Sequence, residues 1–377
     1  MKQRYLALAA GALLAAAGAA QAADIQIYGR VDSGLRYTHT KSSGEDSLVM
    51  RHNRSTPRVG FNIVEDLGNG MKVKAYLENG FTLDDGALGT DDTLFDRRAI
   101  LAVQGAWGEL GMGRMGTVHS TVSPYTMGLI KYDPFGTSYG QASIGTVFAN
   151  TSRVNNAVTW ISPKASGWKV GVTYSLGDKS DEALDNGDGT ETPYEDYCDR
   201  NHTFAAAADY SGDNVYFSVS YANVAYGSME APEYDHDANL FAVGGWYRFI
   251  PEAKIYAGAQ YQSHWTKGAN LTLSNLGSSI TDEEKAGGFD GYSLLLGADY
   301  VVGQHKVIGG VQYFDGELAN DSSIDHQFTV LAAAYEYKLA KTTWLYVAAT
   351  QSLQTGEAKN LSNKEASEVM VGLNLNW

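Results

Sequence analysis

Apolar side chains alternate with polar or small ones along most of this chain. In one such segment Val59, Phe61 and Ile63 occupy one face, opposite polar or small neighbours. A period of two is typical of β-strands that have one face in an apolar medium and the other in a polar one. The pattern predicts 16 strands, at residues 25–37, 57–65, 71–81, 97–104, 109–115, 155–162, 168–176, 203–210, 214–222, 240–248, 253–262, 291–301, 305–313, 327–337, 343–352 and 367–377.

The connections between these strands are of two kinds. Short turns such as residues 66–70 and 163–167 alternate with long polar connectors such as 116–153 and 177–202. A soluble sandwich and a membrane barrel both explain the alternation, because each gives a strand one apolar face. Short turns at one rim and long loops at the other favour the barrel. We therefore expect an all-β fold, a 16-stranded antiparallel transmembrane β-barrel wide enough to hold water.

Aromatic residues and the C-terminus favour the same fold. Tyr37, Trp168 and Tyr261 stand near strand ends, where amphipathic rings would meet lipid headgroups. The last strand alternates up to Trp377, which resembles the terminal aromatic of outer-membrane barrels, although these usually end in Phe. After residue 22 no stretch approaches the roughly 18 apolar residues that a transmembrane helix needs.

The first 22 residues differ from the rest of the chain. Lys2 and Arg4 precede an apolar run of Ala and Leu, and Ala20-Gln21-Ala22 fits a signal-peptide cleavage site. We expect residues 1–22 to be a signal peptide and residues 23–377 to form the barrel.

Composition excludes several classes of protein. Lys and Arg number 28 against 43 Asp and Glu, a net charge of −15, so nucleic acid is not an expected partner. A single cysteine, Cys198, excludes an intramolecular disulfide and a CxxC metal site. The acidic run 185–191 lacks the ligand spacing of a calcium loop, and the histidines are scattered. No metal and no cofactor are expected.

Several segments together resemble the general diffusion porins of Gram-negative bacteria, particularly those of β-proteobacteria. The likeness extends in order over nearly the whole mature chain. Its segments are residues 24–29, 57–61, 65–70, 94–99, 107–114, 153–158 and 162–163, with the last strand. The resemblance implies a homotrimer in the outer membrane, in contact with lipid and lipopolysaccharide, that lets small hydrophilic solutes and ions diffuse passively.

The resemblance also implies that the third extracellular loop folds inward and narrows the channel. This constriction loop corresponds to about residues 116–153. Its only acid is Asp133, as expected for a segment packed against a wall, because buried charges cost desolvation energy.

Matching by motif places arginines on the wall and acids opposite them at the constriction. The implied wall arginines are Arg58, Arg97 and Arg153, the acids are Glu78 and Asp133, and Arg30 and Lys74 are additional wall charges. The local pattern leaves open whether Arg97 or Arg98 faces the lumen. We expect a preference for anions, because loop charges facing bulk solvent are screened beyond about 8–10 Å.

Two other functions fit parts of the sequence. An outer-membrane barrel enzyme would need a nucleophile and a base at the rim, and His119-Ser120 is the nearest candidate, with poor geometry for a relay. A soluble exported sugar-binding β protein is the other alternative, and it would not need detergent for extraction.

Overall fold

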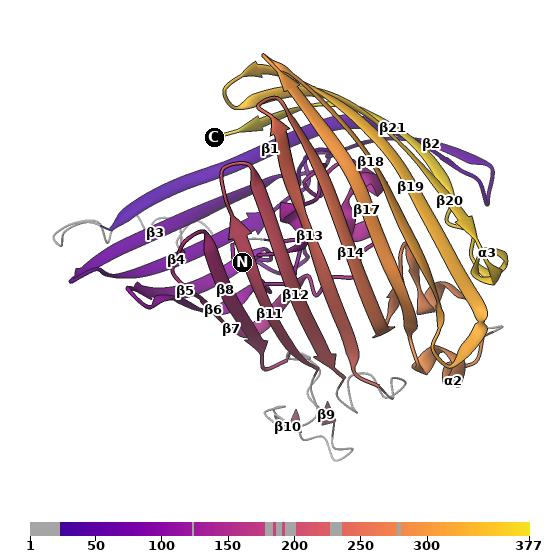
Figure 1. The fold of residues 1–377 in the computed structure, drawn as a ribbon, viewed down its shortest axis with the longest axis horizontal. Helices are drawn as coiled ribbons and strands as arrows, with labels where there is room; N and C mark the ends of the chain where they lie inside the picture. The colour runs from indigo at the N-terminus through magenta and orange to yellow at the C-terminus, as the bar shows by residue number, and fades with distance from the viewer. Residues whose placement is uncertain are drawn as a thin grey trace.

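The computed structural model describes residues 23–122, 124–177, 184–185, 191–192, 201–226, 236–276 and 280–377. The predicted signal peptide, residues 1–22, lies outside them, as do Cys198 and most of the acidic loop 177–202. Most of the described residues belong to the strands of one curved antiparallel sheet (Figure 1). None of the helices among the described residues is long and apolar enough to cross a membrane.

The sheet closes on itself as a barrel of 16 strands, which confirms the predicted fold. Going round the barrel, the strands are β1 (Asp24–Thr40), β3 (Arg58–Gly68), β4 (Met71–Gly80), β5 (Arg98–Gly105), β6 (Gly108–Gly116), β7 (Arg153–Ile161), β8 (Trp168–Ser175), β11 (His202–Ser211), β12 (Val215–Ala225), β13 (Ala238–Ile250), β14 (Ala253–Trp265), β17 (Phe289–Val302), β18 (His305–Leu318), β19 (Asp321–Ala340), β20 (Thr343–Thr355) and β21 (Ala366–Asn376).

The first strand closes the barrel. One edge of β1 pairs with β21, from Arg30 opposite Asn376 to Thr40 opposite Ala366. Its other edge pairs with β3 over residues 24–30. At the seam, the backbone N–H of Trp377 donates to the carbonyl of Gly29 at 3.0 Å, so the C-terminal residue takes part in the closure.

Several strands are longer than the alternation predicts. The predicted ranges leave residues 38–56 outside any strand, whereas β1 continues to Thr40 and β2 (Glu45–Arg51) returns beside it. Likewise β19 spans residues 321–340 rather than 327–337. A ladder of backbone hydrogen bonds can continue where apolar and polar residues no longer alternate, and there the period-two signal disappears.

Side chains are sorted as in a membrane barrel, with apolar groups outward. On the outer surface Phe241 and Leu296 are 48% and 61% exposed. On the inner surface, polar residues such as Ser218 and Gln260 are buried. The outer face therefore suits lipid, while the polar inner face suits water.

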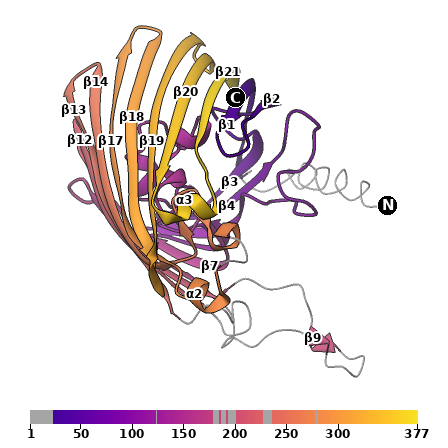
Figure 2. The same cartoon turned by 90° about the vertical axis from the view of Figure 1, so that its right-hand side faces the viewer.

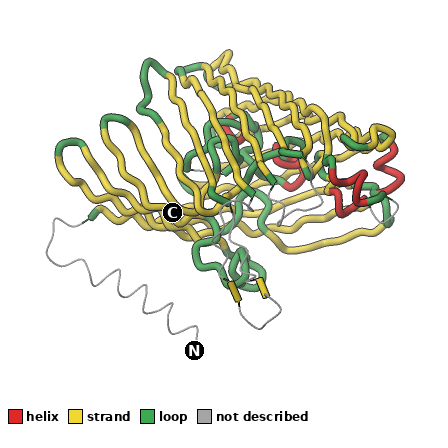
Figure 3. The backbone as a smooth tube through the Cα atoms, turned by 90° about the horizontal axis from the view of Figure 1, so that it is seen from below, coloured by secondary structure: helices red, strands yellow, loops and turns green. Residues whose placement is uncertain are grey.

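The long connector between β6 and β7 folds into the barrel, as predicted (Figure 2). It contains three short 3₁₀ helices, η1 (Leu129–Lys131), η2 (Gly140–Ala142) and η3 (Ile144–Thr146). Leu129 and Phe148 pack in one buried cluster with Phe328 of the wall. A view from below shows loop and helical turns inside the curve of strands (Figure 3). This segment, residues 117–152, is called the constriction loop below.

Glycines in the wall make room for the constriction loop. The ring of Tyr132 lies against Gly244 of β13 and Gly258 of β14, where an added Cβ would come within 2.6 and 2.7 Å of the ring. Real Cβ atoms do not approach that closely, so both positions need glycine for the loop to lie this near the wall.

The remaining elements lie between barrel strands, on the side of the long loops. They are β9 (Leu184–Asp185), β10 (Glu191–Thr192), β15 (Lys267–Gly268), β16 (Leu271–Thr272), η5 (Leu273–Leu276), α2 (Asp282–Ala286) and α3 (Glu357–Leu361). Leu271, Leu276 and Ala358 share a small buried cluster, so the connectors before β17 and before β21 pack against each other.

Candidate functional site: the charged throat of the barrel

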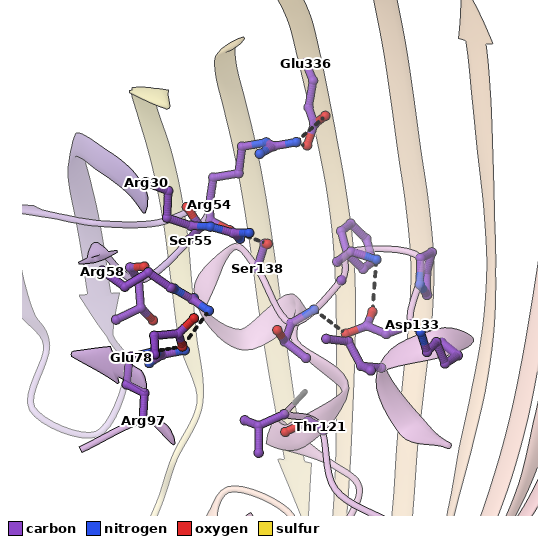
Figure 4. A pocket seen from close by; sticks show the side chains of 18 of the residues that line it. Arg30, Arg54, Ser55, Arg58, Glu78, Arg97, Thr121, Asp133, Ser138 and Glu336 are labelled. Atoms are coloured by element: carbon purple, nitrogen blue, oxygen red, sulfur yellow. Dashed lines mark hydrogen bonds and ion pairs between the residues drawn. The ribbon is translucent and has the colours of Figure 1, made fainter. Parts of the chain in front are cut away.

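A cavity of about 620 Å³ lies between the constriction loop and the barrel wall (Figure 4). Its charged lining is mainly basic, with nine cationic side chains and three carboxylates. The cations are Arg30, Arg54, Arg58, Arg97, Arg98, Lys131, Arg153, Lys254 and Lys306, and the carboxylates are Glu78, Asp133 and Glu336.

Glu78 lies among arginines instead of facing them across the throat. Its carboxylate is 2.7 Å from Nε of Arg97, 3.5 Å from Arg58 and 3.6 Å from Arg98. Only 1% of Glu78 is exposed, and the hydroxyl of Tyr28 also donates to it, at 2.9 Å. The sequence left open whether Arg97 or Arg98 faces the lumen. Both do, because both line the cavity and both contact Glu78.

Neighbouring strands bring these residues together. Arg98 is the Cα partner of Glu78 in the pairing of β4 with β5, so both side chains point inward. Arg58 begins β3, where it is paired with Arg30 of β1 on one side and Gly80 of β4 on the other. The predicted wall arginines therefore do line one cavity, from β1, β3, β7 and the turn before β5.

Two of the wall arginines have no carboxylate partner among the described residues. Arg153, at the start of β7, donates from Nε to the carbonyl of Arg97 at 3.0 Å. Arg30 makes no ion pair within the part of the chain that the structure describes. Both line the cavity, so their charges face its water.

Asp133 lines the cavity, but its carboxylate is engaged by its own loop. It accepts backbone N–H bonds from Phe135 at 2.9 Å, Thr137 at 2.8 Å and Ile144 at 3.0 Å. Burial nevertheless raises the pKa of the Asp133 carboxyl to about 6. Asp133 thus shapes the loop and forms none of the ion pairs found among the described residues.

Sequence reasoning missed Arg54, which lies in the gap between β2 and β3. Residues 52–57 leave the sheet, and Arg54 pairs with Glu336 of β19 through Nε at 2.9 Å. It also donates to Asn374 at 3.1 Å and lies 4.7 Å above the ring of Trp344. The one local signal was a second arginine shortly before Arg58, outside any alternating segment.

The same carboxylate anchors the tip of the constriction loop. The hydroxyl of Tyr139 donates to Glu336 at 2.5 Å, and its ring packs edge-on against Tyr346 with centroids 5.5 Å apart. The backbone N–H of Tyr139 donates to the carbonyl of Asn53 at 2.6 Å. Tyr139 has a left-handed φ of +65°, a strained conformation for a non-glycine residue that these contacts must stabilise.

Lys74 faces inward but does not line the cavity. Its Nζ is 2.8 Å from Glu109, and the same carboxylate accepts the hydroxyl of Tyr125 from the constriction loop at 2.9 Å. Lys74 is therefore paired with a carboxylate in the wall, away from the cavity. Its role as an additional wall charge stays a prediction.

His119 and Ser120 do not form a relay. The Nδ1 atom of His119 lies 3.0 Å from Ser220, whereas the hydroxyl of Ser120 donates to the carbonyl of Thr117 at 2.8 Å. Both residues are fully buried, and they tie the loop to itself and to the wall. Within the described residues no group of three His, Cys, Asp or Glu could hold a metal ion.

Comparisons with known proteins agree with this geometry. A family model described as Gram-negative porin matches residues 7–357. An outer membrane porin protein of Bordetella pertussis is 30% identical over 370 residues, covering 90% of this chain and 91% of the relative.

Solved structures share the fold. An anion-selective porin from Comamonas acidovorans superimposes with a TM-score of 0.71 at 21% identity, covering 94% of this chain and 100% of the other. An outer membrane protein of Vibrio cholerae, in a trimer form, gives a TM-score of 0.60 at 14% identity over 95% of this chain and 100% of the other.

Proposed function

We propose, from the premise that this chain belongs to the Gram-negative porin family and forms a diffusion channel through the outer membrane, that its throat favours anions over cations. One observation carries the proposal. All three carboxylates of the cavity are engaged within the protein, whereas Arg30, Arg153, Lys131 and Lys254 have no carboxylate partner among the described residues.

The consequence is a positive potential inside the throat. Glu78 carries one negative charge against the three arginines that contact it, and Glu336 is balanced by Arg54. A narrow water-filled passage between low-dielectric walls focuses the field of the remaining cations. The many acids elsewhere in the chain act less on a permeating ion, because solvent-exposed charges are screened beyond about 8–10 Å.

The comparison with the Comamonas porin supports this preference, since that protein is described as anion-selective and has the same fold. Solutes are selected here by size and charge, and the proposal requires no reaction and no cofactor.

The test is the reversal potential of the purified protein in a planar bilayer under a KCl gradient. Wild type should favour chloride. Replacing both Arg30→Gln and Arg153→Gln should reduce the chloride-to-potassium permeability ratio about threefold or more. The double variant Lys338→Gln with Lys341→Gln is the matched control, because both lysines are exposed and lie outside the cavity. A wild-type preference for potassium would overturn the proposal.

We also propose that the porin is a homotrimer. All residues of β2 are exposed, including Leu48 and Met50, and so are residues 83–92 between β4 and β5. Exposed apolar residues in the long-loop half of a barrel suit contact with another copy. Light scattering in detergent and conductance steps in groups of three would test the assembly, and a single-barrel mass would contradict it.

The remaining proposals concern export and the membrane. We propose that residues 1–22 are removed as a signal peptide and that lipid and lipopolysaccharide cover the outer apolar face. Intact-mass measurement of the protein from outer membranes should give a chain that begins at Ala23. A mass that includes residues 1–22 would refute the cleavage.

A further inference from the structure

The basic residues of the cavity form two groups that come from different walls. The arginine cluster consists of Arg30, Arg58, Arg97, Arg98 and Arg153. The lysine cluster consists of Lys254 on β14, Lys306 on β18 and Lys131 at the end of η1. Both clusters line the same cavity.

Strand register and loop packing bring the lysine cluster together. Lys254 is the Cα partner of Asp299, whose other neighbour is Ile308, two residues from Lys306 on the same face of β18. Lys131 precedes Tyr132, whose ring lies over Gly244 and Gly258 of β13 and β14. The loop therefore places its lysine on the side of the barrel that carries Lys254.

Lys254 is held in place without a carboxylate. Its Nζ lies 4.5 Å above the ring of Trp246, and that ring stacks on Tyr216 with centroids 6.3 Å apart. The acid nearest in register, Asp299, accepts the hydroxyl of Tyr256 at 2.9 Å and is 3.5 Å from Lys306. Among the described residues no carboxylate lies within ion-pair distance of Lys254. An ammonium group that is held over an indole ring and has no carboxylate partner can bind an anionic ligand.

We propose that the lysine cluster, with Lys254 over Trp246 at its centre, is a second anion subsite, and that the two clusters together bind elongated organic dianions. One anionic group would bind the arginine cluster and the other would bind Lys254, with Lys306 and Lys131 nearby. The inference rests on the proposed anion preference and adds a class of solute to it. A small monovalent anion contacts only one cluster at a time, whereas an elongated dianion contacts both.

The test uses α,ω-dicarboxylates and monocarboxylates of matched chain length as probes. Their binding is measured from the concentration that halves the chloride current of single channels in low salt. In wild type a dicarboxylate should bind about tenfold more tightly than the matched monocarboxylate. Lys254→Gln should weaken dicarboxylate binding about fivefold and monocarboxylate binding by less than about twofold, because a monocarboxylate can still bind the arginine cluster.

Two controls separate the possible outcomes. Lys338→Gln removes the same charge from an exposed position of β19 outside the cavity, and Arg153→Gln should weaken both kinds of probe. Equal effects of Lys254→Gln and Lys338→Gln, or equal weakening of both probe types by Lys254→Gln, would overturn the subsite. Chloride selectivity in the absence of organic acids is measured on the same channels, so failure of the anion preference is recognised separately. Unchanged mobility of the unheated folded barrel on gels shows that each variant folds.

Discussion

The two sides of the throat hold their carboxylates in different ways. On the arginine side, Glu78 shares its charge among three guanidinium groups, which leaves the cluster positive. On the loop side, Glu336 is paired with Arg54 and holds Tyr139, while Asp133 binds backbone N–H groups of its own loop. The effect of a pore carboxylate on a passing ion therefore depends on which protein groups it already binds. On the loop side, the carboxylates hold the loop in position.

The largest effect is expected from removing the anchor of the loop. Tyr139→Ala would leave a cavity at a side chain that is 1% exposed and would free Glu336 from its hydrogen bond. Such truncations of buried aromatic residues cost about 3–5 kcal/mol of stability. We expect a lower urea midpoint for the folded barrel and larger current fluctuations from a mobile loop.

Tyr139→Phe is the matched control, because it removes only the hydroxyl. It should retain the packing against Tyr346 and lose about 1 kcal/mol. If Tyr139→Ala left both stability and current noise unchanged, the loop would be held by other contacts, and the contrast between the two sides would fail.

Removing the shared acid tests the arginine side. Glu78→Gln leaves Arg58, Arg97 and Arg98 without their common carboxylate in a site where Glu78 is 1% exposed. Loss of one partner of a buried ion pair costs about 3 kcal/mol, and the throat also gains positive charge. We expect lower stability together with a stronger chloride preference in bilayer recordings.

Glu317→Gln is the control, since Glu317 is an exposed carboxylate at the end of β18 and does not line the cavity. Glu317→Gln should change neither the stability nor the chloride preference. A Glu78→Gln channel with unaltered selectivity would show that Glu78 does not contribute to the potential felt by a permeating ion.

The arginine side was predictable from the sequence for a physical reason. Arg58 and Glu78 lie on alternating strands whose period fixes which face each side chain takes, and short turns place those strands side by side. Their position on the inner wall follows from local rules. Their effect on permeating ions remains a prediction.

The loop side was not predictable in the same way. Arg54 lies in an interruption of the sheet without alternation, and it meets Glu336 from 282 positions away in the chain. Such a pair depends on closure of the whole barrel, which no local pattern encodes. The resemblance predicted Asp133 as a pore acid, whereas its three N–H bonds depend on turns that only the folded loop shows.

A smaller effect should follow from pH. Burial raises the pKa of Asp133 to about 6, so its negative charge is present at pH 8 and is largely lost by pH 5. Loss of a negative charge from the cavity lining should increase the chloride preference about twofold as the pH falls over this range. The pKa values of His52 and His119 are lowered to about 4, chiefly by burial, so both histidines stay neutral above pH 5.

Asp133→Asn isolates this titration. The variant should show at pH 8 the chloride preference that wild type reaches at pH 5, and it should respond little to pH between these values. A wild-type channel whose selectivity is constant from pH 5 to pH 8 would mean that Asp133 does not affect passing ions.

The smallest effect is expected from substituting Lys74. Comparing this variant with one at Arg30 contrasts a cation that is paired with a carboxylate and a cation that is not. Lys74 is bound to Glu109 at 2.8 Å and does not line the cavity, whereas Arg30 lines it and has no carboxylate partner among the described residues. Lys74→Gln should therefore leave the reversal potential nearly unchanged. Arg30→Gln removes the same formal charge and should shift the reversal potential measurably toward zero. Equal shifts from the two variants would mean that selectivity follows the total charge of the inner wall, and pairing inside the protein would then not decide which cations attract anions.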